Sequence, residues 1–489
     1  MPIPDNNNYH MKTFFSTILF AAAAALAGCM MNPDYQSPAQ SEQIRAAVDF
    51  ENFENAPDEW KKASPRDTDE RGDWWAMFAD DTLSRFMVLC AENNPDVKSL
   101  LYKSEQAAEH ALMTRSALFP HAGAGADYFK SEFGNRSLFT PLGSRFEDWA
   151  VGATLTWDAD LFGRIRSTLE ASRAEAQSVE LQYQNALLAL RTKTAALYFT
   201  YRQLQNQEKI LEKTVEIFKA QTRFVLDKVE MQSASQADAE RAKAQQYSAM
   251  SRLTDIAQKK AAVKNILAAL LGTVPAKLEM PPQKSGFKSP QIPAAVPSAL
   301  LERRADIAAA ERQVRAANYR IGAAQAAFFP TISITSSLGT ESTAFSKLLN
   351  SNSFAWGVSP QIYVPIFQAG RLCAQKRVAL AKHKQCLEDY KSAVLNAVRE
   401  TEDALAKTSL SRRRYAEISA MAQAAQNAES IVKIQYEEGV ADFFQLCEAN
   451  RAALSAKLAL EDAAAERLRA AVELVRALGG APENGKTTE

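Results

Sequence analysis

The stretch that decides the fold runs from Leu161 to Glu230 and reads LFGRIRSTLEASRAEAQSVELQYQNALLALRTKTAALYFTYRQLQNQEKILEKTVEIFKAQTRFVLDKVE. It contains neither Gly nor Pro after Gly163. Its apolar residues recur in steps that are sums of threes and fours, the period of a helix that packs against a partner along one side. That series consists of Tyr183, Leu187, Leu190, Leu197, Tyr201, Leu204, Leu211, Val215, Phe218, Val225 and Val229. The pattern predicts one continuous helix of roughly 70 residues, or about 100 Å at 1.5 Å per residue.

A second long helix is predicted from Arg371 to Glu438. Its apolar side is rich in Ala and includes Leu387, Val394 and Leu405. Helices in globular proteins average about 11 to 12 residues, and a much longer helix needs other helices to cover its apolar side. The two stretches therefore predict a mainly α protein in which shorter helices pack along two long ones.

Four segments show a period of two instead. In the clearest of them, residues 148–158, apolar side chains alternate with small or polar ones, which is typical of a strand between lipid and water. Further strands are predicted at residues 121–133, 331–339 and 354–366. Four strands cannot close a barrel, and an open sheet edge in lipid would leave its backbone groups unpaired. We therefore expect several copies of the chain to pool their strands into one membrane β-barrel.

The second half of the chain repeats the first. Asp96 and Asp306 are 210 residues apart, and a longer set of matches has a spacing of 207. That set pairs Trp149, Gly163, Arg164 and Leu271-Gly272 with Trp356, Gly370, Arg371 and Leu478-Gly479. A period this long indicates duplication rather than a short solenoid repeat. We predict a first repeat at residues 81–280, a Pro-rich connector at 281–297, a second repeat at 298–480 and a tail at 481–489.

Each repeat is predicted to contain a helix, two strands joined by a loop, a long helix, a tight turn and a return helix. The return helices, 236–271 and 443–478, are each about half as long as a long helix. The entry helices end at Phe119 and Phe329, and Pro95 breaks the first of them. We expect the entry and return helices to stack end to end along each long helix.

The N-terminus has the pattern of a signal peptide, residues 1–28, with either Met1 or Met11 as its start. It ends in Leu26-Ala27-Gly28-Cys29, which resembles the bacterial lipobox and implies lipidation of Cys29. The alternative is ordinary cleavage near Ala27, which would leave the cysteine without a role. Residues 29–80 are predicted to form a lipidated N-terminal arm, anchored in the outer-membrane lipid.

Composition argues against several classes of function. The chain carries 57 basic and 57 acidic residues without a long run of either sign, so we expect no nucleic-acid partner. The five Cys and four His residues form no metal-ligand spacing, and no nucleophile motif or phosphate loop is present. We predict no enzymatic activity, no metal and no cofactor.

Several motifs together resemble the TolC-like outer-membrane efflux family, and its NodT-type lipoprotein branch in particular. They are Cys-Met-x-Asn-Pro-Asp-Tyr at residues 29–35, Asp-Trp-Trp at 73–75, Trp-Asp-x-Asp-Leu-Phe-Gly-Arg at 157–164, Val-Pro-Ile-Phe-x-x-Gly-Arg at 364–371 and Tyr-x-x-Gly-Val-x-Asp-Phe at 436–443. The resemblance implies a homotrimer with a 12-stranded β-barrel and a long α-helical tunnel through the periplasm. It also implies two partners, a periplasmic adaptor and an inner-membrane transporter.

The turn after the second long helix is the candidate functional spot. Gly439 ends one helix, and Asp442-x-x-Gln445 has the spacing of a capping box, so a helical hairpin is expected there. The resemblance implies that Phe444 and Glu448 close the tunnel as rings, although family members usually carry Asp in place of Glu448. Three such carboxylates around one axis would repel. The alternative is that Phe444 packs within its hairpin and that Glu448 is a solvated helix charge.

Three functions compete. The leading hypothesis is a passive outer-membrane channel that conducts small molecules out of a tripartite efflux system. A duct for a protein secretion system would use the same tunnel. A lipid-anchored periplasmic coiled-coil adaptor belongs to a different class, and the alternating strands argue against it because an adaptor needs no strand that faces lipid.

Overall fold

A computed structural model describes residues 30–38, 73–132, 145–281 and 304–480. The predicted signal peptide, Cys29 and the predicted tail lie outside the described residues. The chain divides into two compact units. The sheet unit comprises Met1–Ser41, Lys103–Glu180 and Ala309–Lys391, and the hairpin unit comprises Glu42–Tyr102, Leu181–Ala308 and Ser392–Glu489. Each unit therefore takes segments from both predicted repeats.

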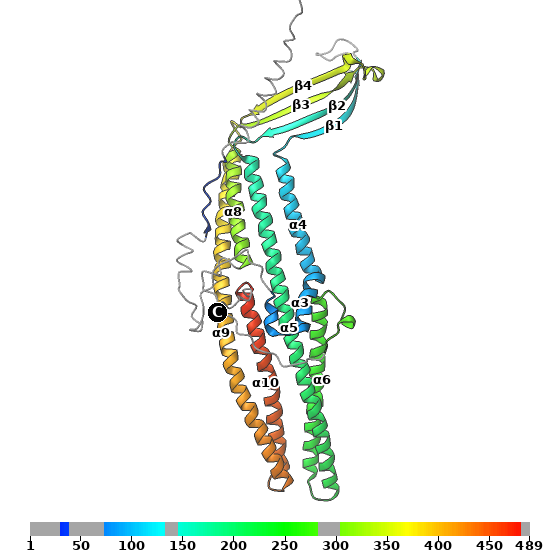
Figure 1. Ribbon diagram of the computed structural model, residues 1–489, viewed down its shortest axis with the longest axis vertical. Coiled ribbons are helices and arrows are strands. Elements are labelled where there is room, and N and C mark those ends of the chain that lie inside the picture. Colours follow the sequence, from blue (N-terminus) through cyan, green and yellow to red (C-terminus); the bar gives the residue numbers. More distant parts are fainter. Residues whose placement is uncertain (1–29, 39–72, 133–144, 282–303, 481–489) are drawn as a thin grey trace, which may run out of the picture. The chain divides into compact units, whose positions relative to one another are not determined.

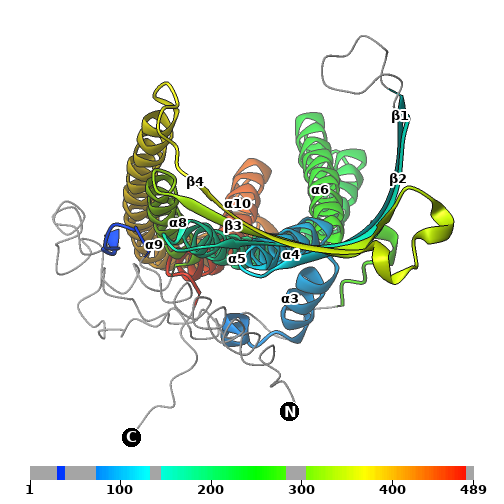
Figure 2. The same ribbon diagram turned by 90° about the horizontal axis from the view of Figure 1, so that it is seen from above.

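The sheet unit contains one antiparallel sheet in the order β1-β2-β3-β4 (Figure 1). Its strands are β1 (His121–Glu132), β2 (Arg145–Ala159), β3 (Thr331–Ser342) and β4 (Phe354–Tyr363). Each repeat supplies one hairpin, and the pairing of β2 with β3 joins the two. Seen from above, the strands form one curved band (Figure 2).

The predicted strand at 354–366 extends too far, since β4 ends at Tyr363. Tyr363 pairs with Thr331, the first residue of β3, so residues beyond it have no partner on that strand. Pro365 also lacks the N–H group that a ladder requires. In contrast, β3 continues past the predicted end at 339, because Ser342 still pairs with Trp149 on β2.

Aromatic side chains cluster at both ends of the strands. At one end, Trp149 lies 4.2 Å from Tyr128 and 5.1 Å from Phe345, measured between ring centroids. At the other end, Phe162 stacks on Phe329 at 4.9 Å. Between the two clusters the strands expose large apolar side chains, namely Val151, Leu155, Leu338, Trp356, Val358 and Ile362. An apolar band flanked by aromatic rings is the pattern of a sheet that faces lipid.

The two predicted long helices are confirmed as α5 (Arg164–Glu230) and α9 (Arg371–Glu437), each of 67 residues. The predicted start of the first, Leu161, is three residues too early. Asp160 accepts hydrogen bonds from the backbone N–H groups of Ile165 (3.0 Å) and Arg166 (2.8 Å), so its carboxylate satisfies the first turn of α5 from outside the helix. Among the described residues, no helix has both the length and the apolar composition needed to cross a membrane.

The short helices also lie at their predicted positions, although the entry helices end three residues before the predicted Phe119 and Phe329. The first entry segment is divided into α3 (Asp81–Asn93) and α4 (Pro95–Ser116), and the second contains α8 (Ala305–Ala326). The return helices are α6 (Gln236–Leu270) and α10 (Phe443–Ala477). In Figure 1, α5 and α6 form one helical hairpin, and α9 and α10 form another.

Within the hairpin unit, each return helix ends against the start of an entry helix. Asn94 donates from Nδ2 to the carbonyl oxygen of Leu270 (3.0 Å), at the end of α6. In the second repeat, Arg304 donates from Nη1 to the carbonyl oxygen of Ala477 (3.1 Å), at the end of α10. Asn94 and Arg304 are 210 residues apart. The predicted end-to-end stacking therefore occurs, and each joint has its own polar cap.

The hydrophobic core of the hairpin unit gathers around the aromatic segment that precedes α3. Trp74, Trp75 and Phe78 lie in the short helix η2 (Trp74–Phe78) and are at most 4% exposed. Phe78 packs against Phe199 of α5 at 5.0 Å, and the Arg191 guanidinium lies 4.8 Å from the Trp75 ring. The segment at residues 73–78 thus attaches the chain before α3 to α5.

The predicted N-terminal arm is described over residues 30–38 and 73–80, and the first of these segments lies in the sheet unit. Asn318 of α8 donates from Nδ2 to the carbonyl oxygen of Pro33 (3.0 Å), and the Tyr35 hydroxyl donates to Glu311 of the same helix. Ser167 of α5 donates from Oγ to Asn32 Oδ1 (2.9 Å). This part of the arm is therefore held by polar contacts to α5 and α8.

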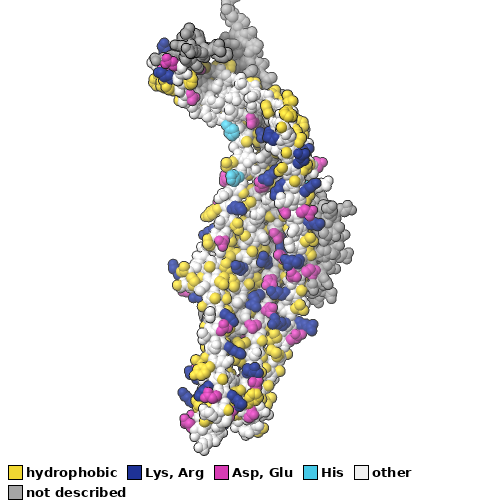
Figure 3. Space-filling view, turned by 180° about the vertical axis from the view of Figure 1, so that it is seen from behind, with side chains coloured by type: hydrophobic (Ala, Val, Ile, Leu, Met, Phe, Trp, Pro, Cys, Tyr) yellow, Lys and Arg dark blue, Asp and Glu magenta, His cyan; other side chains and the backbone are white. Residues whose placement is uncertain are grey.

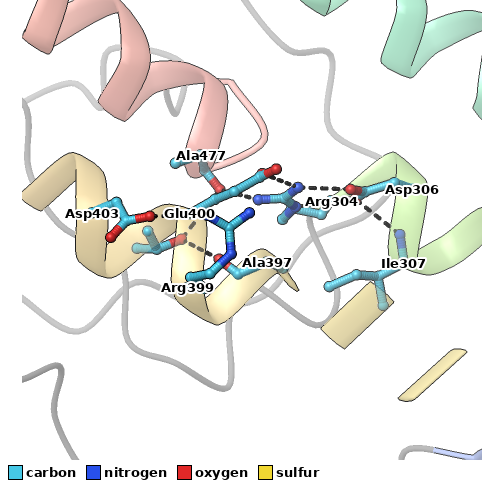
Figure 4. Close-up of polar contacts among 9 residues, drawn as sticks. Arg304, Asp306, Ile307, Ala397, Arg399, Glu400, Asp403 and Ala477 are labelled. Carbon is cyan, nitrogen blue, oxygen red and sulfur yellow. Dashed lines mark hydrogen bonds and ion pairs between the residues drawn. The ribbon is translucent and has the colours of Figure 1, made fainter. Parts of the chain in front are cut away.

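Of the two joints between return and entry helices, the one at Arg304 has more polar contacts (Figure 4). The Arg304 side chain is only 8% exposed and lies 2.6 Å from Asp306 and 2.7 Å from Glu400. Burial disfavours the guanidinium charge, but the hydrogen bonds and charges of Asp306 and Glu400 keep the pKa of Arg304 above its ordinary value. One buried cation thus connects α8, α9 and the end of α10.

We predict that Arg304→Ala destabilises the protein by about 2 to 3 kcal/mol, because it removes the buried cation that donates to two carboxylates and to the Ala477 carbonyl. The control is Arg399→Ala, which removes an exposed i, i+4 pair with Asp403 (3.0 Å) and should change stability by less than about 0.5 kcal/mol. Thermal melting followed by helical circular dichroism compares the two. Equal melting temperatures for the two variants would contradict this role of Arg304.

Candidate functional site

The two helical hairpins end in turns of the same construction. In the first turn, the Ser233 N–H donates to the Lys228 carbonyl (2.8 Å), and in the second the Val440 N–H donates to the Gln435 carbonyl (2.8 Å). The residue in the left-handed conformation is Gln232 (φ 57°) in the first turn and Gly439 (φ 77°) in the second. The first turn therefore has the same geometry as the second, although it carries Gln where the second carries Gly.

Both return helices begin with a reciprocal cap. At the start of α10, the Gln445 N–H donates to Asp442 Oδ1 (2.7 Å), and the Asp442 N–H donates to Gln445 Oε1 (3.0 Å). Ser235 and Asp238 exchange the corresponding bonds at the start of α6, and the hydrogen bond from Ser235 lowers the pKa of Asp238. Turn and cap together fix where the first residues of α10 lie.

Phe444 and Glu448 lie one turn apart at the start of α10. Phe444 is 52% exposed, and the Arg241 guanidinium of α6 lies 5.6 Å from the centroid of its ring. Glu448 accepts a hydrogen bond from Arg451 Nη2 (2.6 Å) in the same helix. Both side chains line a cavity of about 310 Å³ between α6 and α10. The two candidate gate residues therefore line the same cavity.

Beneath this cavity, the two hairpins share one small hydrophobic core. Phe443 and Leu446 of α10 are buried against Val225 of α5 and Ala239 of α6. Cys447 lies beside them, and burial raises the pKa of its thiol to about 11. An uncharged, half-buried thiol is a packing group rather than a nucleophile at neutral pH.

The sequence reasoning missed the cations that meet the aromatic residues across the two hairpins. Arg241 lies over Phe444, and Lys228 Nζ lies 5.0 Å from the Tyr436 ring centroid. One signal for Arg241 was available, because it precedes Glu448 by 207 residues, the spacing of the repeat. The two residues therefore occupy equivalent positions with opposite charge.

The remaining surface offers little evidence of another site. On the face drawn in Figure 3, basic and acidic side chains are interspersed along the helices. In the part of the chain that the structure describes, no group of three or more His, Cys, Asp or Glu side chains could hold a metal ion. The tip of the two hairpins is thus the best-defined candidate site.

A family model for the outer membrane efflux protein matches residues 87–273 and 296–480. The chain belongs to the outer membrane efflux protein family. It is 28% identical to the cation efflux system protein CusC of Escherichia coli K12 over 470 residues, which covers 94% of this chain and 98% of CusC. It is 29% identical to the outer membrane protein OprJ of Pseudomonas aeruginosa over 491 residues, covering 97% and 98% of the two chains.

The structure is similar to a solved member of the family, the Neisseria gonorrhoeae MtrE outer membrane channel in its open state. The TM-score is 0.80 at 28% identity, over 92% of this chain and 98% of MtrE. The predicted TolC-like fold is therefore confirmed, as is the prediction of an efflux protein of the outer membrane. Membership of this efflux family argues against the periplasmic adaptor.

The turn at Gln232 allows a direct test. We predict that Gln232→Gly stabilises the tip of this outer membrane efflux protein by about 1 kcal/mol, because Gly adopts positive φ without the clash of a Cβ atom. Hydrogen exchange of the amides that follow residue 232 should slow by about fivefold. Gln232→Ala is the control, since it keeps the Cβ atom and should give no such slowing. Faster exchange in the Gly variant would show that the turn is not strained.

Proposed function

We propose that the protein is the homotrimeric exit duct of a tripartite efflux pump. In this proposal it conducts small molecules passively from a periplasmic adaptor and an inner-membrane transporter to the exterior. The observation that carries the proposal is the four-stranded sheet, whose order leaves one edge at β1 and the other at β4. In lipid, unpaired edge groups each cost several kcal/mol, so β1 of one copy is expected to pair with β4 of the next.

The number of copies follows from the size of a barrel that holds water. Eight strands leave an interior filled by side chains, and a water-filled pore needs more. Three copies supply 12 strands from the four in the described part of each chain. The family resemblance supports the same number. In the trimer, the exposed apolar side chains between the two aromatic clusters would face lipid.

The gate is the second part of the proposal. In this assignment, Phe444 and Glu448 close the periplasmic end of the tunnel as rings, one residue of each kind from each copy. Their position at the hairpin tip, half exposed and on one side of α10, supports it. The alternative, in which Phe444 only packs and Glu448 only contacts solvent, is weakened by the exposure of Phe444 and by its contact with Arg241 of the other hairpin.

We expect the double variant Phe444→Ala, Glu448→Ala to conduct more often in planar bilayers than the wild type, which should open rarely. Removing six side chains from a trimeric closure widens it, so cells that carry the variant should become sensitive to a large antibiotic such as vancomycin. Val440→Ala is the control, because Val440 is 75% exposed in the same turn and does not line the cavity. If cells with a correctly inserted double variant exclude the antibiotic as well as wild-type cells do, the gate assignment is refuted. If the wild-type protein shows no conductance at all, the channel assignment is refuted.

We further propose that residues 29–80 are a lipidated arm attached through Cys29. The support is the lipobox pattern, together with the polar contacts that hold residues 32–35 in the sheet unit. Acyl chains contribute about 0.8 kcal/mol per buried methylene, so a multiply acylated Cys29 would anchor the chain firmly.

Cys29→Ser should abolish incorporation of labelled palmitate into the protein. Cys373→Ser is the matched control, because Cys373 is an exposed free cysteine and its loss should leave the labelling unchanged. Continued acylation of the Cys29 variant would place the lipid elsewhere.

A further inference from the structure

The cavity at the hairpin tip combines an apolar floor with a cationic rim. Phe218 of α5 and Leu454 of α10 are at most 6% exposed and, with Ala249 of α6, form one small core cluster. All three also line the cavity. Its volume of about 310 Å³ lies at the lower end of the range for small-molecule sites, about 300 to 1,000 Å³. An organic group of modest size would therefore fit against this floor.

The rim carries three arginines and one acidic residue, namely Arg241, Arg252, Arg451 and Glu448. Arg451 is paired with Glu448 at 2.6 Å, and Arg241 is paired with Asp238 at 3.1 Å. Two carboxylates thus oppose three guanidinium groups, which leaves one positive charge. Arg252 has no ion-pair partner among the described residues, so it is the cation that is free to meet a ligand.

The positive charge of the cavity rim reflects a difference between equivalent positions of the two repeats. Glu448 is separated from Arg241 by the repeat spacing of 207 residues, so one hairpin presents an acid where the other presents a base. Arg451, one turn after Glu448, neutralises that acid within α10. The hollow between the two hairpins is therefore cationic, although the candidate gate residue on its rim is acidic.

We propose that this cavity binds an amphiphilic organic anion, with its apolar body on Phe218, Leu454 and Phe444 and its acidic head at Arg252. The guanidinium group suits a carboxylate, sulfonate or phosphate head because its donors match two acidic oxygens at once. Binding at this site does not require that the channel conducts. If the proposed gate is correct, the ligand contacts Phe444 and Glu448 directly, and amphiphilic anions become the cargo class that the tip recognises.

Two dyes that differ in one acidic group can test the proposal. Anilinonaphthalene sulfonate and phenylnaphthylamine share an aromatic body, and only the first carries a sulfonate. Fluorescence titrations would use full-length protein in nanodiscs of phosphatidylcholine, with empty nanodiscs subtracted. We expect saturable binding of the sulfonate dye at one site per chain, and this binding should weaken as salt is added.

Arg252→Gln should weaken binding of the sulfonate dye by about threefold to fivefold, the range for an exposed ion pair, and leave the neutral dye unchanged. Arg223→Gln is the control, because Arg223 is an exposed arginine of α5 that does not line the cavity. Ser248→Trp, at an exposed lining position of α6, should fill the cavity and abolish saturable binding of both dyes without disturbing the core.

The proposal is overturned if Arg252→Gln leaves the sulfonate dye unaffected, if it weakens both dyes equally, or if Ser248→Trp has no effect. These outcomes are independent of the gate, which is tested by conductance. If the Phe444 and Glu448 double variant shows no leak, the gate assignment is refuted. The result of the binding experiment is unaffected.

Discussion

A helix of 67 residues with one apolar side is unstable unless other helices cover it. No single partner of the same length is available within each repeat, because the chain must leave the helical part to form two strands and then return. The cover is therefore made from two shorter pieces, an entry helix and a return helix. This division creates a joint, and the last carbonyl groups of the return helix would be left unpaired at it. At the two joints, Asn94 and Arg304 donate hydrogen bonds to carbonyl groups at the ends of the return helices.

The two repeats use different donors at their joints. Asn94 satisfies the Leu270 carbonyl with a neutral amide, and its Oδ1 also accepts from the N–H groups of Asp96 and Val97. Arg304 satisfies the Ala477 carbonyl with a buried cation that then requires Asp306 and Glu400. A buried ion pair is not more stabilising than a neutral contact in general. Its effect here is to connect three helices through one side chain.

The sequence predicts most of this fold because its dominant signals are periodic and local. The long helices, the broken first entry helix and the reciprocal cap at Asp442 follow from spacing alone. The spacing of residues within a segment does not show which groups outside the segment will contact it. β4 ends at Tyr363 because β3 begins opposite it, and α5 begins at Arg164 because the Asp160 carboxylate reaches its first turn from outside. In both cases the boundary depends on a group that lies beyond the segment itself.

The same limit applies to the two compact units. They cut across the repeats because strands of different repeats pair with each other, as β2 does with β3. A duplicated sequence indicates two similar structures, but it does not indicate that each one packs by itself. Contacts between the repeats, and not contacts within them, determine where the compact units divide.

At the tip, two cations beside Glu448 also change the expected electrostatics. From the sequence, three copies of Glu448 around one axis should repel, which would either favour an open tip or raise the affinity of one carboxylate for a proton or cation. In the structure, Glu448 is paired within its own helix with Arg451, and Arg241 of the other hairpin lines the same hollow. An exposed pair of this kind contributes only about 0.2 to 1 kcal/mol, but it reduces the net charge that each copy brings to the axis. In the proposed gate, repulsion between carboxylates is therefore a weak force for opening. The contacts between the two hairpins, Phe443 in the shared core and Phe444 beside Arg241, would have to break for that gate to open.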